Sequence, residues 1–497
     1  MAQRSHWEKA LLITPLILLL HLGYRLLDQS QMIQHFPLDF ANDVSSYMAQ
    51  LHFLEVCGFH QPCPYWYNGF TTFQFSPPGW YFFAYPFYLV LNNVQLIAYL
   101  SIILSLIAAF FLLWHYGKST GFSRVKRIAF FALFFANASA IGNFIRLGRV
   151  HELLSWVIFI PLFFLLYHYR NRQLNKKFLL VIPLYAALIL VYHSTAVLAG
   201  FLWLGFLLTR TSWKEAGKTI ATIFLAAFLA GFWLFPFIAG IFQESAAIPH
   251  LKQGSWILDF SRQHLFNNLA VFIVSLACII AFFFWKKYSK PQKTDIRFFI
   301  PTLILAALFF LHLTPFIPVI NQIFPDPVIH YLLFFAIFFF LSTHYTPRWG
   351  KFAAFAIIVI VAASILVNIF HTQPFIQPDT PREQEFLSYL PSLQERFIIM
   401  NYNQLPYNEA FYSLAAIQNK ASASGWYPEE KSYTYIKRIA NIEQSANTRD
   451  CPAFITELQY FNTTEILSGR EFCSFLEECG LQEMTTKKET CFYKFTS

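Results

Sequence analysis

Charged residues are scarce in this chain: they make up 13% of its 497 residues, whereas an ordinary soluble chain is about a quarter charged. Asp and Glu are nearly missing from a series of apolar runs between residues 10 and 370. Apolar residues make up 56% of the sequence, and 60 of them are phenylalanine. This shortage of charge excludes an ordinary soluble protein. It predicts a membrane part, residues 1–370, followed by a globular part, residues 371–497.

The apolar runs are long enough to cross a bilayer, which takes about 20 apolar residues in a helix. The predicted fold class is therefore mainly α: a polytopic membrane helix bundle with a small C-terminal α+β domain. The first run lacks a small-residue cleavage motif after it, so we expect an uncleaved anchor. We expect about eleven spanning helices, over residues 10–27, 94–115, 128–145, 151–168, 178–193, 196–208, 219–238, 267–285, 298–313, 328–343 and 352–370.

Lys and Arg are unevenly distributed between the loops. With the N-terminus in the cytoplasm, the inner segments hold 20 of them, and the outer segments up to residue 370 hold 5. Basic loops are retained on the cytoplasmic side during insertion, so this asymmetry places the C-terminal domain outside the plasma or inner membrane. The basic residues that produce the net charge of +9 then lie beside the anionic lipids of the cytoplasmic leaflet. Because the membrane accounts for this charge, we expect no nucleic-acid partner.

Cysteine is absent from the expected spans except at Cys278. The others fall on the expected outer side, which is oxidising, so disulfides are predicted. The most local pairing is Cys57–Cys63, the connectivity of the other four is open, and free thiols are the alternative. Neither a C-x-x-C motif nor a Cys/His spacing typical of zinc is present, so structural zinc is not expected. The six outer cysteines are Cys57, Cys63, Cys451, Cys473, Cys479 and Cys491.

The outer loop 28–93 contains no Lys or Arg at all. Asp39 and Asp43 precede an apolar stripe at helical spacing, which predicts an interfacial helix lying on the bilayer surface. Asp43 falls at its expected N-cap, so its plainest role is to accept hydrogen bonds from first-turn amides. An aromatic stretch around Trp66 follows, suited to stacking on a sugar or to anchoring the loop. Residues 77–91 are expected to be a partly inserted juxtamembrane segment.

Two stretches of this loop carry a family resemblance: Asp39-Phe40-Ala41-Asn42-Asp43-Val44-Ser45-Ser46-Tyr47 and Ser76-Pro77-Pro78-Gly79-Trp80-Tyr81-Phe82. With the N-terminal anchor before them, they resemble the GT-C membrane glycosyltransferases. The order of elements is also similar to that of membrane proteins named as related to 6-pyruvoyl-tetrahydropterin synthase.

The resemblance implies sugar transfer from a polyprenyl-phosphate donor to a glycan, lipid or protein acceptor outside the membrane. It also implies that Asp43, with Asp39 as the alternative or second carboxylate, acts on the acceptor. Pro77 and Pro78 would then border the substrate site. A carboxylate can take the proton of a hydroxyl as it attacks the anomeric carbon. The polyprenyl phosphate leaves as a stable anion, so one base and cationic phosphate ligands would suffice.

The phosphate ligands are sought among the few outer cations. Arg146 and Arg149 are the first candidates, because the guanidinium matches phosphate oxygens. In the alternative, one of them pairs with Glu152 and the other reaches lipid headgroups. Further candidates at outer helix ends and loops are His193, Lys252, Arg262 and His330, each of which could equally be a packing residue or a solvated loop residue. His330 stands where related proteins would be expected to carry Arg.

Other chemistry and other functions stay open. A divalent cation held by Asp39, Asp43 and Asp326 is possible, but the sequence has no ligand spacing that predicts one. The C-terminal domain contains no phosphate loop, nucleophile elbow or Cys-His pair, and we assign it to acceptor recognition or to support of the outer site. The alternatives to transfer are a transporter or flippase for a lipid-linked sugar, an O-antigen polymerase or ligase, and a non-catalytic assembly or receptor protein.

Overall fold

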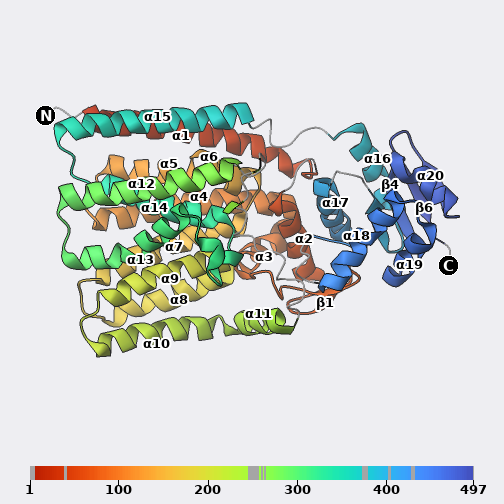
Figure 1. The fold of residues 1–497 in the computed structure, drawn as a ribbon, viewed down its shortest axis with the longest axis horizontal. Helices are drawn as coiled ribbons and strands as arrows, with labels where there is room; N and C mark the ends of the chain where they lie inside the picture. The colour runs from red at the N-terminus through yellow and green to blue at the C-terminus, as the bar shows by residue number, and fades with distance from the viewer. Residues whose placement is uncertain are drawn as a thin grey trace.

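The computed structural model describes residues 6–38, 42–243, 257–258, 261, 265–371, 379–400, 405–426 and 431–495. Long helices lie side by side in a bundle, and the C-terminal domain sits at one end of it (Figure 1). The bundle and its outer loop contain α1 (His6–Gln29), α2 (Asp43–Val56), β1 (Pro62–Cys63), β2 (Phe70–Thr71), α3 (Gly79–Leu91), α4 (Val94–Ser119), α5 (Arg124–Phe135), α6 (Ala138–Ala140), η2 (Ile141–Arg146), α7 (Val150–Tyr169), α8 (Val181–Val191), α9 (His193–Leu208), α10 (Trp213–Leu229), α11 (Gly231–Gln243), α12 (Leu265–Ser289), α13 (Lys293–Phe310), α14 (Pro325–Ser342) and α15 (Pro347–His371).

Five helices in the described ranges are long and apolar enough to cross a membrane: α4, α7, α12, α14 and α15. Two bent pairs, α5 with α6–η2 and α10 with α11, raise this number to seven if each pair is one span. The bend is 51° in the first pair and 81° in the second. The expected count of about eleven therefore stays a prediction.

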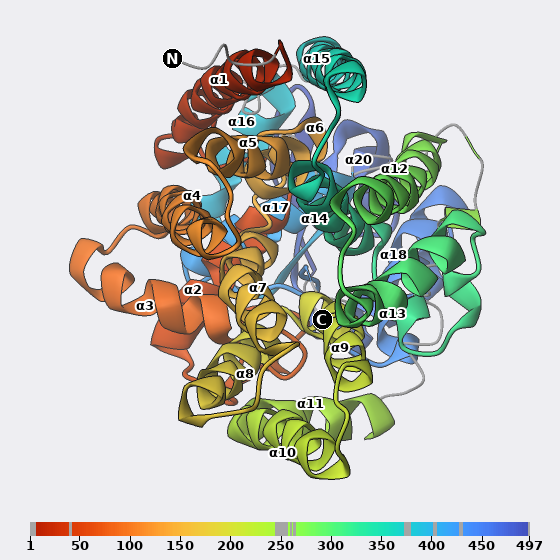
Figure 2. The ribbon, with the colours of Figure 1, turned by 90° about the vertical axis from the view of Figure 1, so that its left-hand side faces the viewer.

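The central helices differ from the peripheral ones in burial. Buried residues make up 83% of the apolar stretch of α7 and 78% of that of α14, against 28% for α15. Figure 2 shows α14 near the middle of the bundle, with α1 and α15 side by side at its edge. Phenylalanines fill the space between α7 and α14, where the Phe163 and Phe334 rings lie 5.2 Å apart. The heavy use of phenylalanine thus builds the bundle core.

Several of the basic loops lie together at the end of the bundle away from the C-terminal domain (Figure 1). Arg170, after α7, forms an ion pair with Asp295 in α13. Arg210, after α9, donates to the Tyr169 carbonyl at 2.8 Å, and Lys126 in α5 donates to the Leu341 carbonyl in α14. These loops thus lie at one end of the bundle, and the side of the membrane that they face stays a prediction.

Helix α2 is present where the apolar pattern predicted a helix, but it does not lie on a surface. Its residues from Val44 to Phe53 are all buried. Val44 and Leu51 belong to the core of the bundle, whereas Ala49 and Phe53 belong to the core of the C-terminal domain. The prediction of an interfacial helix lying on the bilayer surface was wrong, because α17 covers the face of α2 that the apolar pattern left open.

The C-terminal domain combines helices with a four-stranded sheet of order β3-β4-β6-β5. Strands β3 and β4 are parallel, and the other pairs are antiparallel. The sequence pattern predicts helices over about 381–390, 409–419, 431–447 and 470–478 and strands at 397–400 and 491–495, and all of these are present. It does not predict α19, β4 or β5. The elements are α16 (Pro381–Tyr389), β3 (Phe397–Met400), α17 (Leu405–Ile417), α18 (Tyr433–Asn447), α19 (Cys451–Phe461), β4 (Glu465–Gly469), α20 (Arg470–Glu478), β5 (Gln482–Thr486) and β6 (Thr490–Lys494).

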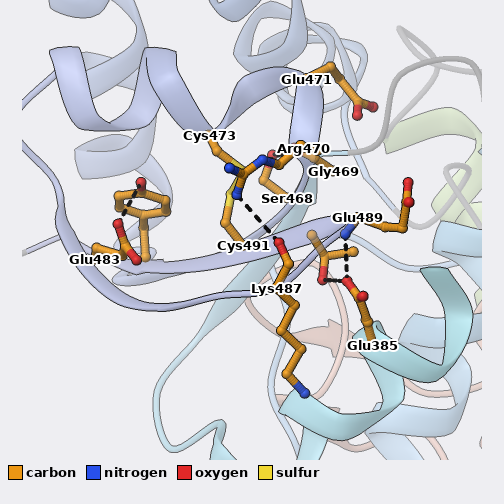
Figure 3. The surroundings of a disulfide bond; sticks show 12 residues. Glu385, Ser468, Gly469, Arg470, Glu471, Cys473, Glu483, Lys487, Glu489 and Cys491 are labelled. Carbon is orange, nitrogen blue, oxygen red and sulfur yellow. Dashed lines mark hydrogen bonds between the residues drawn. A yellow bond between two sulfur atoms is a disulfide. The ribbon is translucent and has the colours of Figure 1, made fainter. Parts of the chain in front are cut away.

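All six outer cysteines form disulfides, as predicted. Cys57–Cys63 is the expected local bridge, and the two open pairings are Cys451–Cys479 and Cys473–Cys491. The last joins α20 to β6 (Figure 3). Cys278 is a buried free thiol in α12.

The outer loop and the C-terminal domain share one core. The Trp66 ring is fully buried, and its Nε1 donates to the Tyr412 carbonyl at 3.2 Å. A Cβ at Gly425 would come within 2.7 Å of the Trp66 side chain, so glycine is needed for this close approach. Trp66 therefore holds the loop to the domain, and it is not exposed for stacking on a sugar.

Candidate functional site

The first turn of α2 is capped by two neighbours. The Asn42 side chain accepts from the Ser45 amide at 2.9 Å, so the N-cap is Asn42 and not Asp43. The Asp43 and Val44 amides donate to the Leu147 carbonyl at 2.9 and 3.2 Å. Because these partners satisfy the first-turn amides, the Asp43 carboxylate is not used as a cap. The capping role expected for Asp43 was wrong by one residue.

Gly148 allows the segment before α7 to approach α2 this closely. Its φ is +62°, and a Cβ there would lie 2.5 Å from the Val44 Cβ. Only glycine tolerates both the left-handed backbone and the contact. The next residue, Arg149, is thereby placed beside Asp43.

We expect Gly148→Ala to destabilise the protein by about 2–4 kcal/mol, because it adds left-handed strain to a steric clash. The measurement is thermal unfolding of the full chain in detergent. Gly142→Ala is the matched control in the same segment, since a Cβ at Gly142 meets nothing within 4 Å. Equal unfolding temperatures for the two variants would contradict the role of Gly148.

Arg149 connects two carboxylates that are far apart in sequence. Its Nε donates to Asp43 Oδ2 at 2.8 Å, and its Nη1 donates to Asp326 Oδ2 at 2.8 Å. Nη1 also donates to Asn143 Oδ1 at 3.2 Å. The side chains of Asp43, Asp326 and Arg149 are 29%, 20% and 15% exposed, so solvent reaches all three. We call Arg149, Asp43, Asp326 and Asn143 the Arg149 cluster.

The charges in the Arg149 cluster do not balance. Burial alone would lower the pKa of Arg149, but Asp43 and Asp326 raise it well above its ordinary value, and the guanidinium stays charged. Tyr192, the residue after α8, lies near Arg149. Two carboxylates around one guanidinium leave the cluster one negative charge in excess.

The Pro77–Pro78 segment packs close to the cluster. Gly79 begins α3, and a Cβ there would lie 2.5 Å from Val191 Cγ2, just before Tyr192. Two residues further on, the Tyr81 ring lies 4.9 Å from the ring of His151 in α7. Pro77 and Pro78 are themselves buried. They thus set the path of α3 against α7 and α8, within a few residues of Arg149 and Tyr192.

Glu152 and His330 form a fully buried pair, each with 0% side-chain exposure. His330 Nδ1 donates to Glu152 Oε1 at 2.7 Å, and its Nε2 lies 3.2 Å from Ser139 Oγ. Within the described part of the chain, Glu152 Oε2 is buried without a hydrogen bond. Among the described residues, neither Arg146 nor Arg149 forms an ion pair with Glu152. His330 is enclosed in the bundle, so it cannot contact a phosphate unless the bundle rearranges.

Of the remaining predicted residues, the structure describes Arg146 and His193, and neither is one of the four residues of the Arg149 cluster. Arg146 ends η2 and is half-buried. His193 begins α9 with its ring 5.9 Å from that of Phe237. Asp39, Lys252 and Arg262 lie outside the described residues. Among the described residues, no group of three or more His, Cys, Asp or Glu side chains is arranged to hold a metal ion.

Asn143, a member of the cluster, and Tyr192, its neighbour, were not foreseen. Asn143 lies in the segment that contains Arg146 and Arg149, and Tyr192 precedes His193. The only signal for either was its position beside a predicted site residue. Asp326 was considered as an outer carboxylate, but not as a partner of Arg149.

Solved structures match this arrangement of helices. Arabinofuranosyltransferase AftD from Mycobacteria aligns with a TM-score of 0.59 at 12% identity, over 97% of this chain and 40% of AftD. ArnT from Cupriavidus metallidurans, bound to undecaprenyl phosphate, aligns with a TM-score of 0.50 at 9% identity, over 96% of this chain and 97% of ArnT. The chain has the GT-C fold. The apo oligosaccharyltransferase from Archaeoglobus fulgidus aligns with a TM-score of 0.53 at 9% identity, over 93% of this chain and 69% of that enzyme.

The GT-C fold agrees with the resemblance carried by the outer loop, and with its apolar helices it makes the chain an integral membrane protein. This chain spans about two fifths of the length of AftD. No protein-family model matches the chain, and no curated protein matches it in sequence.

Proposed function

We propose that this GT-C protein transfers a sugar from a polyprenyl-phosphate donor to an acceptor on the extracytoplasmic side, with Asp43 as the general base. The acceptor is a glycan, a lipid or a protein. One observation carries the proposal: the carboxylate at the position of the GT-C acid, Asp43, is joined at 2.8 Å to the Arg149 guanidinium. A base and a phosphate-binding cation are the two groups that this reaction requires.

The chemistry assigns one role to each group. Asp43 removes the proton from an acceptor hydroxyl as the oxygen attacks the anomeric carbon, which typically contributes 10²- to 10⁴-fold to the rate. The bond between the anomeric carbon and the phosphate oxygen breaks at the same time. Arg149 stabilises the charge that collects on the departing phosphate. The proton stays on Asp43 until solvent removes it, and the partial exposure of the carboxylate permits this exchange.

The transport alternative requires ionisable groups along a path near the bilayer midplane. Asp43 and Asp326 instead lie in the first turns of α2 and α14, and Arg149 immediately precedes α7. These positions at helix starts favour chemistry at the outer end of the bundle.

A donor-lipid screen on the purified full chain tests the proposal. We expect one class of polyprenyl-phosphate sugar to transfer its radiolabelled sugar to an envelope extract, and a nucleotide sugar to transfer none. Transfer from the nucleotide sugar alone, or release of label across a vesicle membrane without a new covalent product, would contradict the proposed function.

A further inference from the structure

Three side chains accept hydrogen bonds from the Arg149 guanidinium. A guanidinium has five N–H groups, two on each Nη and one on Nε. Nε donates to Asp43, and Nη1 donates to Asp326 and Asn143. Within the described residues, the hydrogen bonds of Arg149 to the protein come from Nε and Nη1, and Nη2 makes none. A phosphate that approaches Arg149 can therefore bind Nη2, whereas Nε and Nη1 already donate to the two carboxylates.

The excess negative charge opposes an incoming phosphate. Asp43 and Asp326 each hold a nitrogen of Arg149 at 2.8 Å, so the cluster repels a further anion until one carboxylate withdraws. Hydrogen bonds between charged groups are about twice as strong as neutral ones. The two aspartates consequently compete with phosphate for the same cation.

The two aspartates differ in exposure. Both lie in the first turn of a helix, Asp43 in α2 and Asp326 in α14, so a helix dipole favours each carboxylate. The Asp326 side chain is 20% exposed, against 29% for Asp43. Asp43 is thus the carboxylate that solvent and substrate reach first. A phosphate that binds Arg149 displaces Asp43 and leaves its carboxylate free to act as a base.

We propose that Asp326 is a positioning residue that retains Arg149 and limits its affinity for phosphate, so that donor binding releases Asp43 from Arg149. Asp326 thereby couples donor occupancy to the availability of the base. This inference rests on the proposed function, because it takes the donor phosphate as the ligand of Arg149.

Equilibrium binding of undecaprenyl phosphate to the full chain in nanodiscs tests the inference without any sugar transfer. We expect Asp326→Asn to tighten binding about fivefold, since it removes a competing charge worth about 1 kcal/mol. Asp326→Glu keeps the charge and should bind as the unmodified protein does. Arg149→Gln should lose the preference for phosphate. Undecaprenol, which lacks the phosphate, should bind all variants equally.

Glu55→Gln is the control, because it removes a carboxylate charge at the far end of α2, outside the Arg149 cluster. It should give no gain in phosphate affinity. If the unmodified protein binds undecaprenyl phosphate no better than undecaprenol, the proposed function fails. If it prefers the phosphate but Asp326→Asn binds equally or more weakly, the proposed function stands and the competition by Asp326 is overturned. A gain for undecaprenol as well would also overturn it, because the effect would then be one of packing.

Discussion

Replacing Asp43 with asparagine is expected to lower kcat for sugar transfer by about 10²- to 10⁴-fold. The amide has almost the same shape, so α2 keeps its Asn42 cap and its two amide bonds to the Leu147 carbonyl. It cannot accept the acceptor proton. Because the amide also removes one of the two charges that compete for Arg149, donor affinity should hold or improve. The loss should therefore appear in kcat and not in the KM for the donor.

The measurement is initial-rate transfer from the donor identified in the screen, with thermal unfolding as the check on folding. Glu55→Gln is the control, because Glu55 lies at the other end of α2 and accepts a hydrogen bond from the Tyr88 hydroxyl. This variant should retain transfer. Full activity of Asp43→Asn would remove Asp43 as the base. A raised KM with unchanged kcat would assign it to binding alone.

Properties that depend on composition or local pattern were predictable from the sequence. The membrane class follows from the shortage of charge, and the Cys57–Cys63 bridge follows from a separation of six residues. The start of α2 was predicted to within one residue from its apolar spacing. Its burial was not, because the face that looked free is covered by α17, more than 350 residues further along the chain.

The composition of the site could be predicted better than its geometry. Asp43 and Arg149 were candidates, yet 106 residues separate them, and 177 residues separate Arg149 from Asp326. A contact over such separations leaves no spacing to recognise. The alternative in which an arginine pairs with Glu152 used the nearest carboxylate in the sequence. In the folded chain, Glu152 forms a hydrogen bond with His330 instead, which lies 178 residues away in the sequence.

Two strands of the C-terminal sheet were missed for a related reason. Strand β4 is buried at all five positions, and β5 is exposed at its first four. Neither alternates between apolar and polar residues, which is the pattern that reveals a half-buried strand. β4 lies between β3 and β6 in the sheet, and this position explains its uniform burial.

Breaking the Glu152–His330 pair is expected to have the largest effect on stability. Both side chains are fully buried, so His330→Leu leaves the Glu152 carboxylate in the bundle without its donor. Removing the hydrogen-bond partner of a buried carboxylate typically costs about 3–5 kcal/mol, because the remaining group is desolvated and unpaired. Replacing both residues with leucine removes the need for a partner. The double variant should therefore recover most of the stability lost in the single one.

Unfolding free energies of the two single variants and the double variant, measured in the same detergent, give the coupling between Glu152 and His330. Glu478→Gln is the control, because its partner Arg449 and Glu478 are both about half exposed in the C-terminal domain. An exposed pair is worth about 0–1 kcal/mol. A cost for His330→Leu no larger than that of Glu478→Gln would show that the buried pair does not stabilise the bundle. A double variant as unstable as the sum of the single ones would show that the two residues act independently, through packing and not through their mutual hydrogen bond.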